Sequence, residues 1–355
     1  MVTRSKARWL LAGAVVLAAA CRPELEGRPS LVKSERILAV RSVPADAKPQ
    51  AKVRFDSLFV GPDGALDGEV LDWALCKKRA SLTEAGSIAS ECLEREADEL
   101  EQLGTGPGVD GSVIKESCEI FGPTPPTPKA GEPNARPADP DTTGGFYQSV
   151  RVLSGDGPSD YAVGVTRLGC GLGGATQEQS AEFTRRYLPN ENPALDSLTL
   201  TRDEEDEQVL PDVQSDELLT VNAGETVTLR ASWADCGGSG ECGDGVCVDA
   251  EDEDAESCPE DCQTPHGCSG AEPYVYFDPL NRSLTDRREA MRVSWFATAG
   301  RFEHERTGRA EDEASELSTD NTWTAPDESM ELRLWVVLRD DRGGVGWGSY
   351  RLQVD

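Results

Sequence analysis

Histidine and basic residues are scarce in this sequence. Of its 355 residues only two are histidine, and 35 Lys and Arg face 65 Asp and Glu, which gives a formal net charge of −30 at pH 7. A surface with this charge repels the phosphates of nucleic acids, so the composition argues against a nucleic-acid partner. It also attracts cations and keeps a secreted protein soluble.

The common catalytic motifs are missing as well. Neither G-x-S-x-G nor H-E-x-x-H occurs, and the two histidines are His266 and His304. Glu303 and Glu305 flank His304, but adjacent residues of a strand point to opposite faces, so they would not orient its ring for a triad. The 65 acidic residues offer many accidental carboxylate pairs, which leaves glycoside hydrolysis open without favouring any pair. We therefore expect no enzymatic activity.

Long apolar runs are absent except at the N-terminus. Residues 9–20 form a twelve-residue apolar run, which is too short to cross a bilayer comfortably. Arg4, Lys6 and Arg8 precede it. A positive start followed by a short apolar core predicts a secretory signal peptide over residues 1–20.

The end of this run, "LAAAC", resembles the lipobox of bacterial lipoproteins. The resemblance implies that Cys21 becomes the lipidated N-terminus and anchors the protein in a membrane, which takes several acyl chains to be stable. The alternative is an ordinary signal peptide with Cys21 as an incidental thiol. Arg22 follows in place of the aspartate that retains many lipoproteins in the inner membrane, which favours the outer membrane. Residues 21–36 then form a lipidated tether.

Residues 37–205 are expected to form a first, decorated β-sandwich-like lobe. Short strand signals are interrupted by helical spacing in 81–103, with a Ser81–Glu84 capping box, and by seven prolines in 121–145, which predict an extended loop. A second helix is expected near 176–188. The acidic run at 202–208 marks the expected boundary.

Residues 212–355 contain short strand signals separated by turns, the pattern of a β-sandwich. The phrases "AGETVTLRASW", "VSWFATAGRF" and "TWTAP" resemble bacterial immunoglobulin-like or PKD-like modules. The expected fold class is mainly β: two immunoglobulin-like β-sandwich lobes, the first with a helical and Pro-rich insertion and the second with a disulfide-rich insertion over 236–268. Most tryptophans are expected in the cores, and Trp347 is the best exposed candidate for stacking on a sugar.

Ten cysteines remain besides Cys21, and secretion makes disulfides their expected state. We expect Cys76 to pair with Cys170 and Cys92 with Cys118 in the first lobe. The second lobe holds six, whose pairing the sequence leaves open among fifteen arrangements: Cys236, Cys242, Cys247, Cys258, Cys262 and Cys268.

The segment "CGDGVCVDAEDEDAESCPEDC" (242–262) resembles small cysteine-rich repeats of secreted proteins, which implies a disulfide module and no activity. Zinc is the rival interpretation, but only one cysteine gap has the length typical of a zinc knuckle. Calcium is a further alternative, because several carboxylates lie on one loop, although the EF-hand order is absent. Its candidate ligands are Asp244, Asp249, Glu251, Asp252, Asp254, Glu256 and Asp261.

Gly169, Gly171 and Gly174 spell G-x-G-x-x-G between a strand-like and a helix-like segment. A dinucleotide site needs a parallel βαβ unit with an acidic residue at the end of the next strand, and Asp196 precedes that strand instead. A tight glycine turn beside Cys170 is the favoured interpretation.

Together these features predict a non-catalytic lipoprotein of the bacterial envelope, structural, adhesive or ligand-presenting at the cell surface. Its partners would be the membrane, through the lipid anchor, and an unidentified protein or glycan; no cofactor is expected except possible calcium. The alternatives are a periplasm-facing assembly partner of an envelope complex and an extracellular hydrolase.

Overall fold

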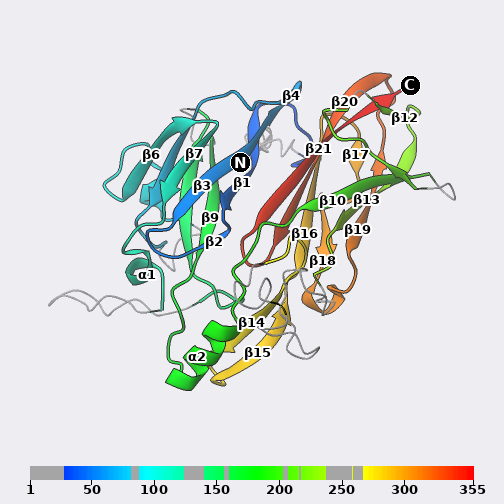
Figure 1. Ribbon diagram of the computed structural model, residues 1–355. Coiled ribbons are helices and arrows are strands. Elements are labelled where there is room, and N and C mark those ends of the chain that lie inside the picture. The colour runs from blue at the N-terminus through cyan, green and yellow to red at the C-terminus, as the bar shows by residue number, and fades with distance from the viewer. Residues whose placement is uncertain are drawn as a thin grey trace, which may run out of the picture.

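The computed structural model describes residues 28–80, 88–123, 140–155, 160–202, 207–215, 217–236, 258 and 267–355. The predicted signal peptide, Cys21, Ser81 and Glu84, most of the Pro-rich loop and all candidate calcium ligands lie outside these ranges. The described part is mainly β, as predicted, and its strands form two lobes that lie side by side (Figure 1).

The first lobe is a sandwich of two sheets. One sheet has the order β1-β3-β4, with β7 also paired to β3, and the other has the order β2-β9-β8-β5-β6. The bounds are β1 (Arg36–Val43), β2 (Asp46–Ala47), β3 (Lys52–Gly61), β4 (Gly64–Ala65), β5 (Leu71–Cys76), β6 (Leu100–Gly106), β7 (Gly108–Ser112), β8 (Tyr147–Leu153) and β9 (Tyr161–Leu168).

The second lobe is also a two-sheet sandwich, with the orders β11-β10-β13-β19-β17 and β12-β21-β20-β16-β18. Its strands are β10 (Leu195–Thr201), β11 (Gln208–Val209), β12 (Leu219–Val221), β13 (Thr226–Trp233), β16 (Met291–Ala297), β17 (Arg301–Phe302), β18 (Arg306–Arg309), β19 (Ser318–Thr324), β20 (Met330–Asp340) and β21 (Val345–Val354). The pairing of β10 with β13 puts residues 195–201, which we had assigned to the first lobe, into the second.

The two lobes share one strand order. In each, the first long strand pairs with the second, which pairs in turn with a later strand: β1-β3-β7 and β10-β13-β19. In each, a short strand runs parallel to the last strand of the opposite sheet, β2 beside β9 and β12 beside β21. The sequence shows no tight repeat, so this correspondence is visible only in the pairing. It is the arrangement of an immunoglobulin-like sandwich in both lobes.

A tryptophan fills the centre of each sandwich at the same place. Trp73 on β5 and Trp295 on β16 are both 0% exposed. Each lies opposite a valine of the next strand, Val152 and Val336 respectively. The expected burial is also confirmed for Trp233, Trp323 and Trp335.

The lobes are joined through the outer faces of two sheets. Along β20, Leu334 and Val336 face the core of the second lobe, whereas the alternate residues Trp335 and Val337 contact the first lobe. The partners of these two include Leu58 on β3. Because β20 is buried on both faces, its sequence is a nearly continuous apolar run. The sheet of β1 and β3 therefore packs on the sheet of β16, β20 and β21, and the two lobes lie side by side (Figure 1).

Part of the predicted tether is packed. Val32 is 1% exposed in the apolar cluster between the lobes. Its N–H donates to Ala297 O at 2.9 Å, and Ala297 N–H donates to Ser30 O at 2.9 Å. Residues 30–32 therefore run beside β16 of the second lobe, so the last part of the segment predicted as a lipidated tether, 21–36, is packed against the domain.

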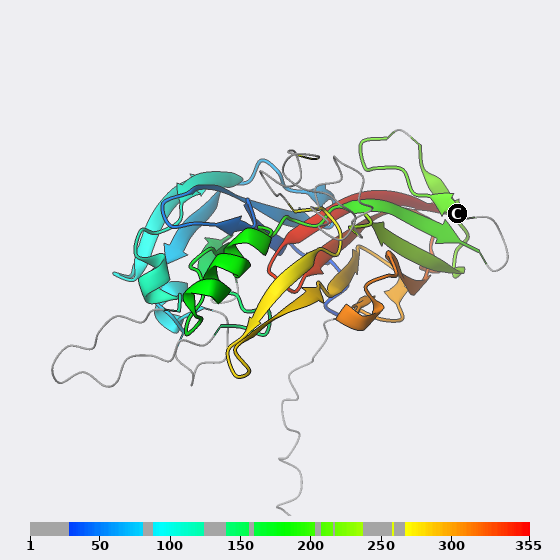
Figure 2. The same cartoon turned by 60° about the horizontal axis from the view of Figure 1, so that its bottom comes forward.

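The helix α2 (Gln177–Arg186) confirms the second predicted helix. A capping box between Thr176 and Gln179 starts it. It packs on a hairpin of β14 (Pro273–Asp278) and β15 (Ser283–Arg288), and Figure 2 shows the two side by side. The hairpin and the Cys-rich segment both lie between β13 and β16 of the second lobe.

The other predicted helix, over 81–103, is wrong in its described part. Residues Ser90–Leu93 form a single 3₁₀ turn, η1, and Leu100 begins strand β6. The apolar residues that suggested helical spacing, among them Ile88, pack instead into a small cluster beside β5. A four-residue helix, α1 (Ser117–Ile120), follows later in the lobe. Among the described residues, no helix has the length and apolar character needed to cross a membrane.

Candidate functional site

Three disulfides are described, and two of them correct the predicted pairing. Cys76 pairs with Cys92 and Cys118 with Cys170, so both bonds of the first lobe link other partners than expected. The prediction failed because it relied on the helix over 81–103. With that helix absent, Cys92 folds back against the end of β5.

The Cys-rich insert is closed at its base. Cys236 pairs with Cys268 across a separation of 32 residues, and Cys258 is also disulfide-bonded. The backbone N–H of Cys268 donates to Glu272 Oε1 at 2.6 Å. Arg288 Nη2 donates to Cys236 O at 2.8 Å. The base of the insert is thereby attached to a cluster of buried charges.

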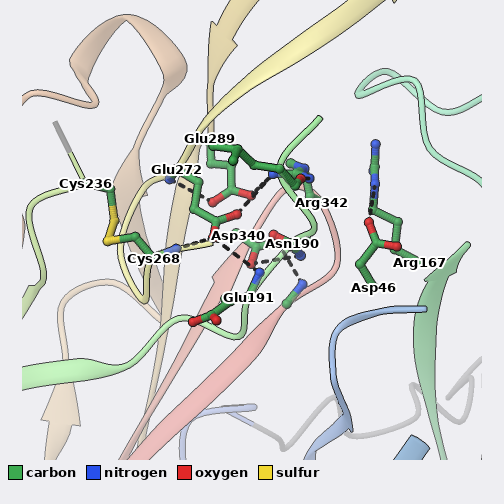
Figure 3. A network of polar contacts seen from close by, with 12 residues as sticks. Asp46, Arg167, Asn190, Glu191, Cys236, Cys268, Glu272, Glu289, Asp340 and Arg342 are labelled. Atoms are coloured by element: carbon green, nitrogen blue, oxygen red, sulfur yellow. Dashed lines mark hydrogen bonds and ion pairs between the residues drawn. A yellow bond between two sulfur atoms is a disulfide. The ribbon is translucent and has the colours of Figure 1, made fainter. Parts of the chain in front are cut away.

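This buried charged junction lies where the second lobe meets α2 and the hairpin. Glu272 precedes β14 and Glu289 follows β15, while Asp340 ends β20 and Arg342 lies in the turn between β20 and β21. Asn190 arrives from the segment after α2. Figure 3 shows these side chains pointing toward one another, and each is at most 8% exposed.

Arg342 is the cation at the centre. Its Nη1 lies 3.0 Å from Glu272 Oε2 and 3.4 Å from Glu289 Oε1, and its Nη2 donates to Leu188 O at 2.7 Å. With its amide oriented to satisfy both ends, Asn190 donates to Glu289 Oε1 at 2.7 Å and accepts from Gly344 N–H at 3.2 Å. Segments far apart in the sequence are thus joined by one network.

The junction holds three carboxyl groups against one guanidinium. Burial raises the pKa of Glu272 to about 8, despite the opposing effect of Arg342. Burial, with Asp340 and Glu272 nearby, raises the pKa of Glu289 well above its ordinary value, and burial raises the pKa of Asp340. Protons therefore stay on this cluster at neutral pH. Glu272 is 1% and Glu289 0% exposed, and both carboxylates accept hydrogen bonds from Arg342, which indicates a structural arrangement.

A second buried cation continues the network into the first lobe. Arg167, at the end of β9, donates from Nη1 to Thr143 Oγ1 and to Tyr147 Oη, both at 2.8 Å. Its Nε lies 3.8 Å from Asp46 Oδ2. Tyr187, after α2, donates a hydrogen bond to Asp46. Figure 3 places Arg167 and Asp46 beside the first cluster.

The glycine-rich segment lines a pocket next to Arg167. The pocket has a volume of about 390 Å³, and its walls include Gly169, Gly171 and Phe183 of α2. Gly171 and Gly174 have φ angles of 74° and 75°, which favour glycine. β9 and β10, on either side of α2, belong to different sheets. The parallel βαβ unit of a dinucleotide site is therefore absent here, and the tight-turn interpretation holds.

The remaining candidates do not converge on a site. His304 is exposed, and its Nε2 lies 4.0 Å from Glu303 Oε1. Trp347, proposed as an exposed sugar platform, packs instead at the interface of the lobes, where the Arg41 guanidinium lies 4.2 Å from its ring centre. Within the described ranges, no three His, Cys, Asp or Glu side chains are placed to hold a metal ion.

Comparison with known proteins gives no family for this chain. No family model matches it, and no curated protein does. Among solved structures, it is similar to the C-terminal domain of the Streptococcus agalactiae AgI/II polypeptide BspA, at 10% identity, covering 90% of this chain and 99% of that one with a TM-score of 0.22. It is also similar to the D00-D0 domain of Intimin, at 8% identity, 88% and 99% coverage and a TM-score of 0.18.

A third structure, the Yersinia pseudotuberculosis adhesin InvE, is 7% identical, with 93% of this chain and 61% of that one covered and a TM-score of 0.20. TM-scores this low carry no argument about function. The fold assignment therefore rests on the strand order of this chain itself.

The buried junction was not predicted from the sequence. Glu272, Glu289 and Asp340 resemble the many exposed carboxylates of an acidic protein, and nothing in their spacing marks them. The one available signal is Arg342, a basic residue in the "DDRGG" turn between two strand-like segments.

Proposed function

We propose that this protein is a non-catalytic lipoprotein of the bacterial envelope, anchored through Cys21 in the outer membrane, which presents loops to a protein or glycan ligand at the cell surface. The N-terminal signal pattern supports the anchor and the secretion route. The acidic composition agrees with a secreted protein and speaks against nucleic acid as a partner.

The observation that carries the proposal is the joining of the two sandwiches into one frame. The apolar interface around Trp335 and Val337 holds the sheets together on one side. Asn192 adds a polar clamp, because its Nδ2 donates to Ser42 O at 2.7 Å and its Oδ1 accepts from Val345 N–H at 2.9 Å. Loops carried on such a frame keep a fixed geometry for binding, as in other sandwich proteins.

The loops available for presentation cluster around the buried charged junction. The Cys-rich insert is closed by Cys236–Cys268, and the hairpin β14–β15 ends at Leu280, which is 92% exposed. Since Glu272 and Glu289 have no access to solvent, the perturbed carboxylates found here do not favour the hydrolase alternative.

Protease treatment of intact cells tests the proposal, together with mass spectrometry of the membrane-extracted protein. We expect a mature N-terminus at acylated Cys21 and cleavage at the exposed loops by protease added outside. An acylated protein that is cleaved only after the outer membrane is permeabilised would favour the periplasm-facing assembly partner. A non-acylated, released protein would refute the anchor.

A further inference from the structure

Arginines gather on the outer face of one edge of the second lobe, in a protein with a net charge of −30. Arg292 on β16 lies directly opposite Arg339 on β20, and Ser294 on β16 lies opposite Arg306 on β18. Like charges directly opposite each other destabilise a sheet unless an anion compensates them. We refer to Arg36, Arg292, Arg306 and Arg339 as the arginine stripe.

The stripe lacks carboxylate partners over most of its length. Among the described residues, neither Arg292 nor Arg306 forms an ion pair or donates a side-chain hydrogen bond, and both are exposed. Arg339 is half-buried and donates from Nη2 to Leu38 O at 3.0 Å. Burial, with Arg306 and Arg292 nearby, lowers the pKa of Arg339 to about 10. Arg36, at the other end of the stripe, lies near the carboxylate of Glu305. The described ion pairs include no carboxylate for Arg292, Arg306 or Arg339, so this end of the face carries positive charge.

The stripe borders a groove between the lobes. Arg292 and Arg306 line it from the second lobe, and Tyr147 and Val165 line it from the first, around a volume of about 870 Å³. Asp141, Asp340 and Asp341 also line this groove, and burial raises the pKa of Asp341 to about 6. Exposed guanidinium groups beside an open groove suit phosphate oxygens, which they bind with paired hydrogen bonds.

The stripe also lies where the chain approaches its proposed anchor. The Arg36 guanidinium stands 5.6 Å from the ring centre of Phe296, next to Ser294 on the same face of β16. Arg36 Nη1 donates to Pro29 O at 3.0 Å. From Arg28, the first described residue, a chain of seven residues back to Cys21 spans at most about 25 Å. A lipid on Cys21 therefore keeps the membrane surface within reach of the stripe.

We propose that the arginine stripe docks on the phosphate headgroups of the membrane that holds the lipid anchor, and so fixes the orientation of an otherwise acidic protein. The inference rests on the proposed acylation of Cys21 for its geometry. Each basic residue near an anionic surface contributes enough attraction to change partitioning about fivefold, and this attraction falls off within a Debye length.

The first test is hydrogen exchange of the full, acylated protein in two kinds of vesicle: phosphatidylcholine alone, and phosphatidylcholine mixed with phosphatidylglycerol. We expect the amides of the edge strand β18 and of residues 30–36 to exchange several-fold more slowly in the anionic vesicles, and the difference to vanish at high salt. The double variant Arg292→Gln/Arg306→Gln should lose it. The matched control Arg185→Gln/Arg230→Gln, which removes two exposed arginines from α2 and from β13, should keep it. Equal exchange in both vesicles would overturn the proposal.

The second test separates the stripe from the anchor. The non-acylated chain, mixed with the same anionic vesicles, should cosediment about 25-fold more strongly than Arg292→Gln/Arg306→Gln. The non-acylated chain can show this binding even if Cys21 is never acylated in cells. In that case the proposed anchor would be wrong, and the binding of the stripe to anionic lipid would still stand. Loss of binding upon addition of inorganic phosphate, with no loss in chloride of equal ionic strength, would identify a site for free phosphate and overturn membrane docking.

Discussion

The two lobes have the same strand order but differ in where their turns lie. In the first lobe, the turn between β8 and β9 includes Ser154, which is exposed. In the second lobe, the corresponding turn between β20 and β21 carries Arg342, which is 0% exposed. In the second lobe, this turn of the shared frame therefore forms the centre of a buried junction.

The difference shows how one immunoglobulin-like lobe can be held in a fixed position relative to another. The second lobe inserts the Cys-rich segment and the hairpin between β13 and β16, and the insert brings Glu272 and Glu289 to the turn that holds Arg342. The first lobe contributes Arg167 and Asp46 next to them. A buried ion pair adds little stability by itself, but it specifies one arrangement, because any other leaves charges unpaired. We infer that the network selects the relative placement of the lobes.

The largest effect is expected at the feature that both lobes share. Trp73→Ala and Trp295→Ala each remove a fully buried indole from the centre of a sandwich. Each should lower the free energy of unfolding by about 4 kcal/mol. Denaturant unfolding followed by circular dichroism measures both. If the apolar interface couples the lobes, both variants shift a single transition; two separate transitions would show that the lobes unfold independently.

The disulfides test the contrast between the lobes. Removing Cys118–Cys170, with a separation of 52 residues, should cost about 4 kcal/mol, whereas removing Cys76–Cys92, with a separation of 16, should cost about 3 kcal/mol, because a longer closed loop restricts the unfolded chain more. Paired Cys→Ala variants under denaturant give the two values. If removing Cys76–Cys92 costs more, native contacts and not loop length determine how much each disulfide stabilises the protein.

In the second lobe, Cys236→Ala/Cys268→Ala should act on the interface as well. The backbone of Cys268 holds Glu272, so opening the bond loosens the buried junction. Hydrogen exchange should then rise around Gly344, whose N–H donates to Asp340 Oδ1 at 2.8 Å. Unchanged hydrogen exchange at Gly344 would show that the Cys236–Cys268 bond does not stabilise the buried junction.

The sequence allowed the strands to be predicted, but not their partners. Alternation around Val53 and Phe55 and the apolar run through Trp335 indicated strands because burial of one or both faces leaves a local pattern. Strand pairing leaves no such local pattern. Two immunoglobulin-like lobes were expected from a resemblance, but the individual strand pairs could not be predicted. The helix predicted over 81–103 failed because tertiary packing of Leu100 in a strand outweighed its helical spacing. Carboxylates in the buried junction were missed because burial depends on the insert that brings them there.

A further prediction concerns the two buried glutamates of the second lobe. The folded-state pKa of Glu272, about 8, lies above its ordinary value of 4.5, and that of Glu289 is raised well above 4.5. The folded state therefore holds protons that the unfolded state has released. This stabilisation is complete below about pH 4.5 and is lost as the pH rises through about 8, with a slope of about 1 kcal/mol per pH unit for each retained proton.

Thermal unfolding between pH 5 and pH 9 measures this effect. The acidic surface also destabilises the protein as pH rises, so the comparison is between the wild type and Glu289→Gln, which keeps the shape of the side chain but cannot ionise. The melting temperature of Glu289→Gln should fall less steeply with rising pH than that of the wild type. If the melting temperatures of the two proteins fall equally with pH, a group other than Glu289 causes the pH dependence.

The smallest effect separates two tryptophans that otherwise match. Trp295 Nε1–H donates to the side chain of Thr307 at 2.9 Å, whereas Trp73 Nε1–H donates to the backbone oxygen of Gly106 at 2.8 Å. Thr307→Val should therefore leave the indole N–H of the second lobe without an acceptor and cost about 1–2 kcal/mol. Trp295→Phe combined with Thr307→Val is the control, because removing donor and acceptor together cancels the penalty for an unpaired group. If Thr307→Val costs as much with Phe at position 295 as with Trp, the hydroxyl contributes through packing alone, and the two lobes depend on their tryptophans in the same way.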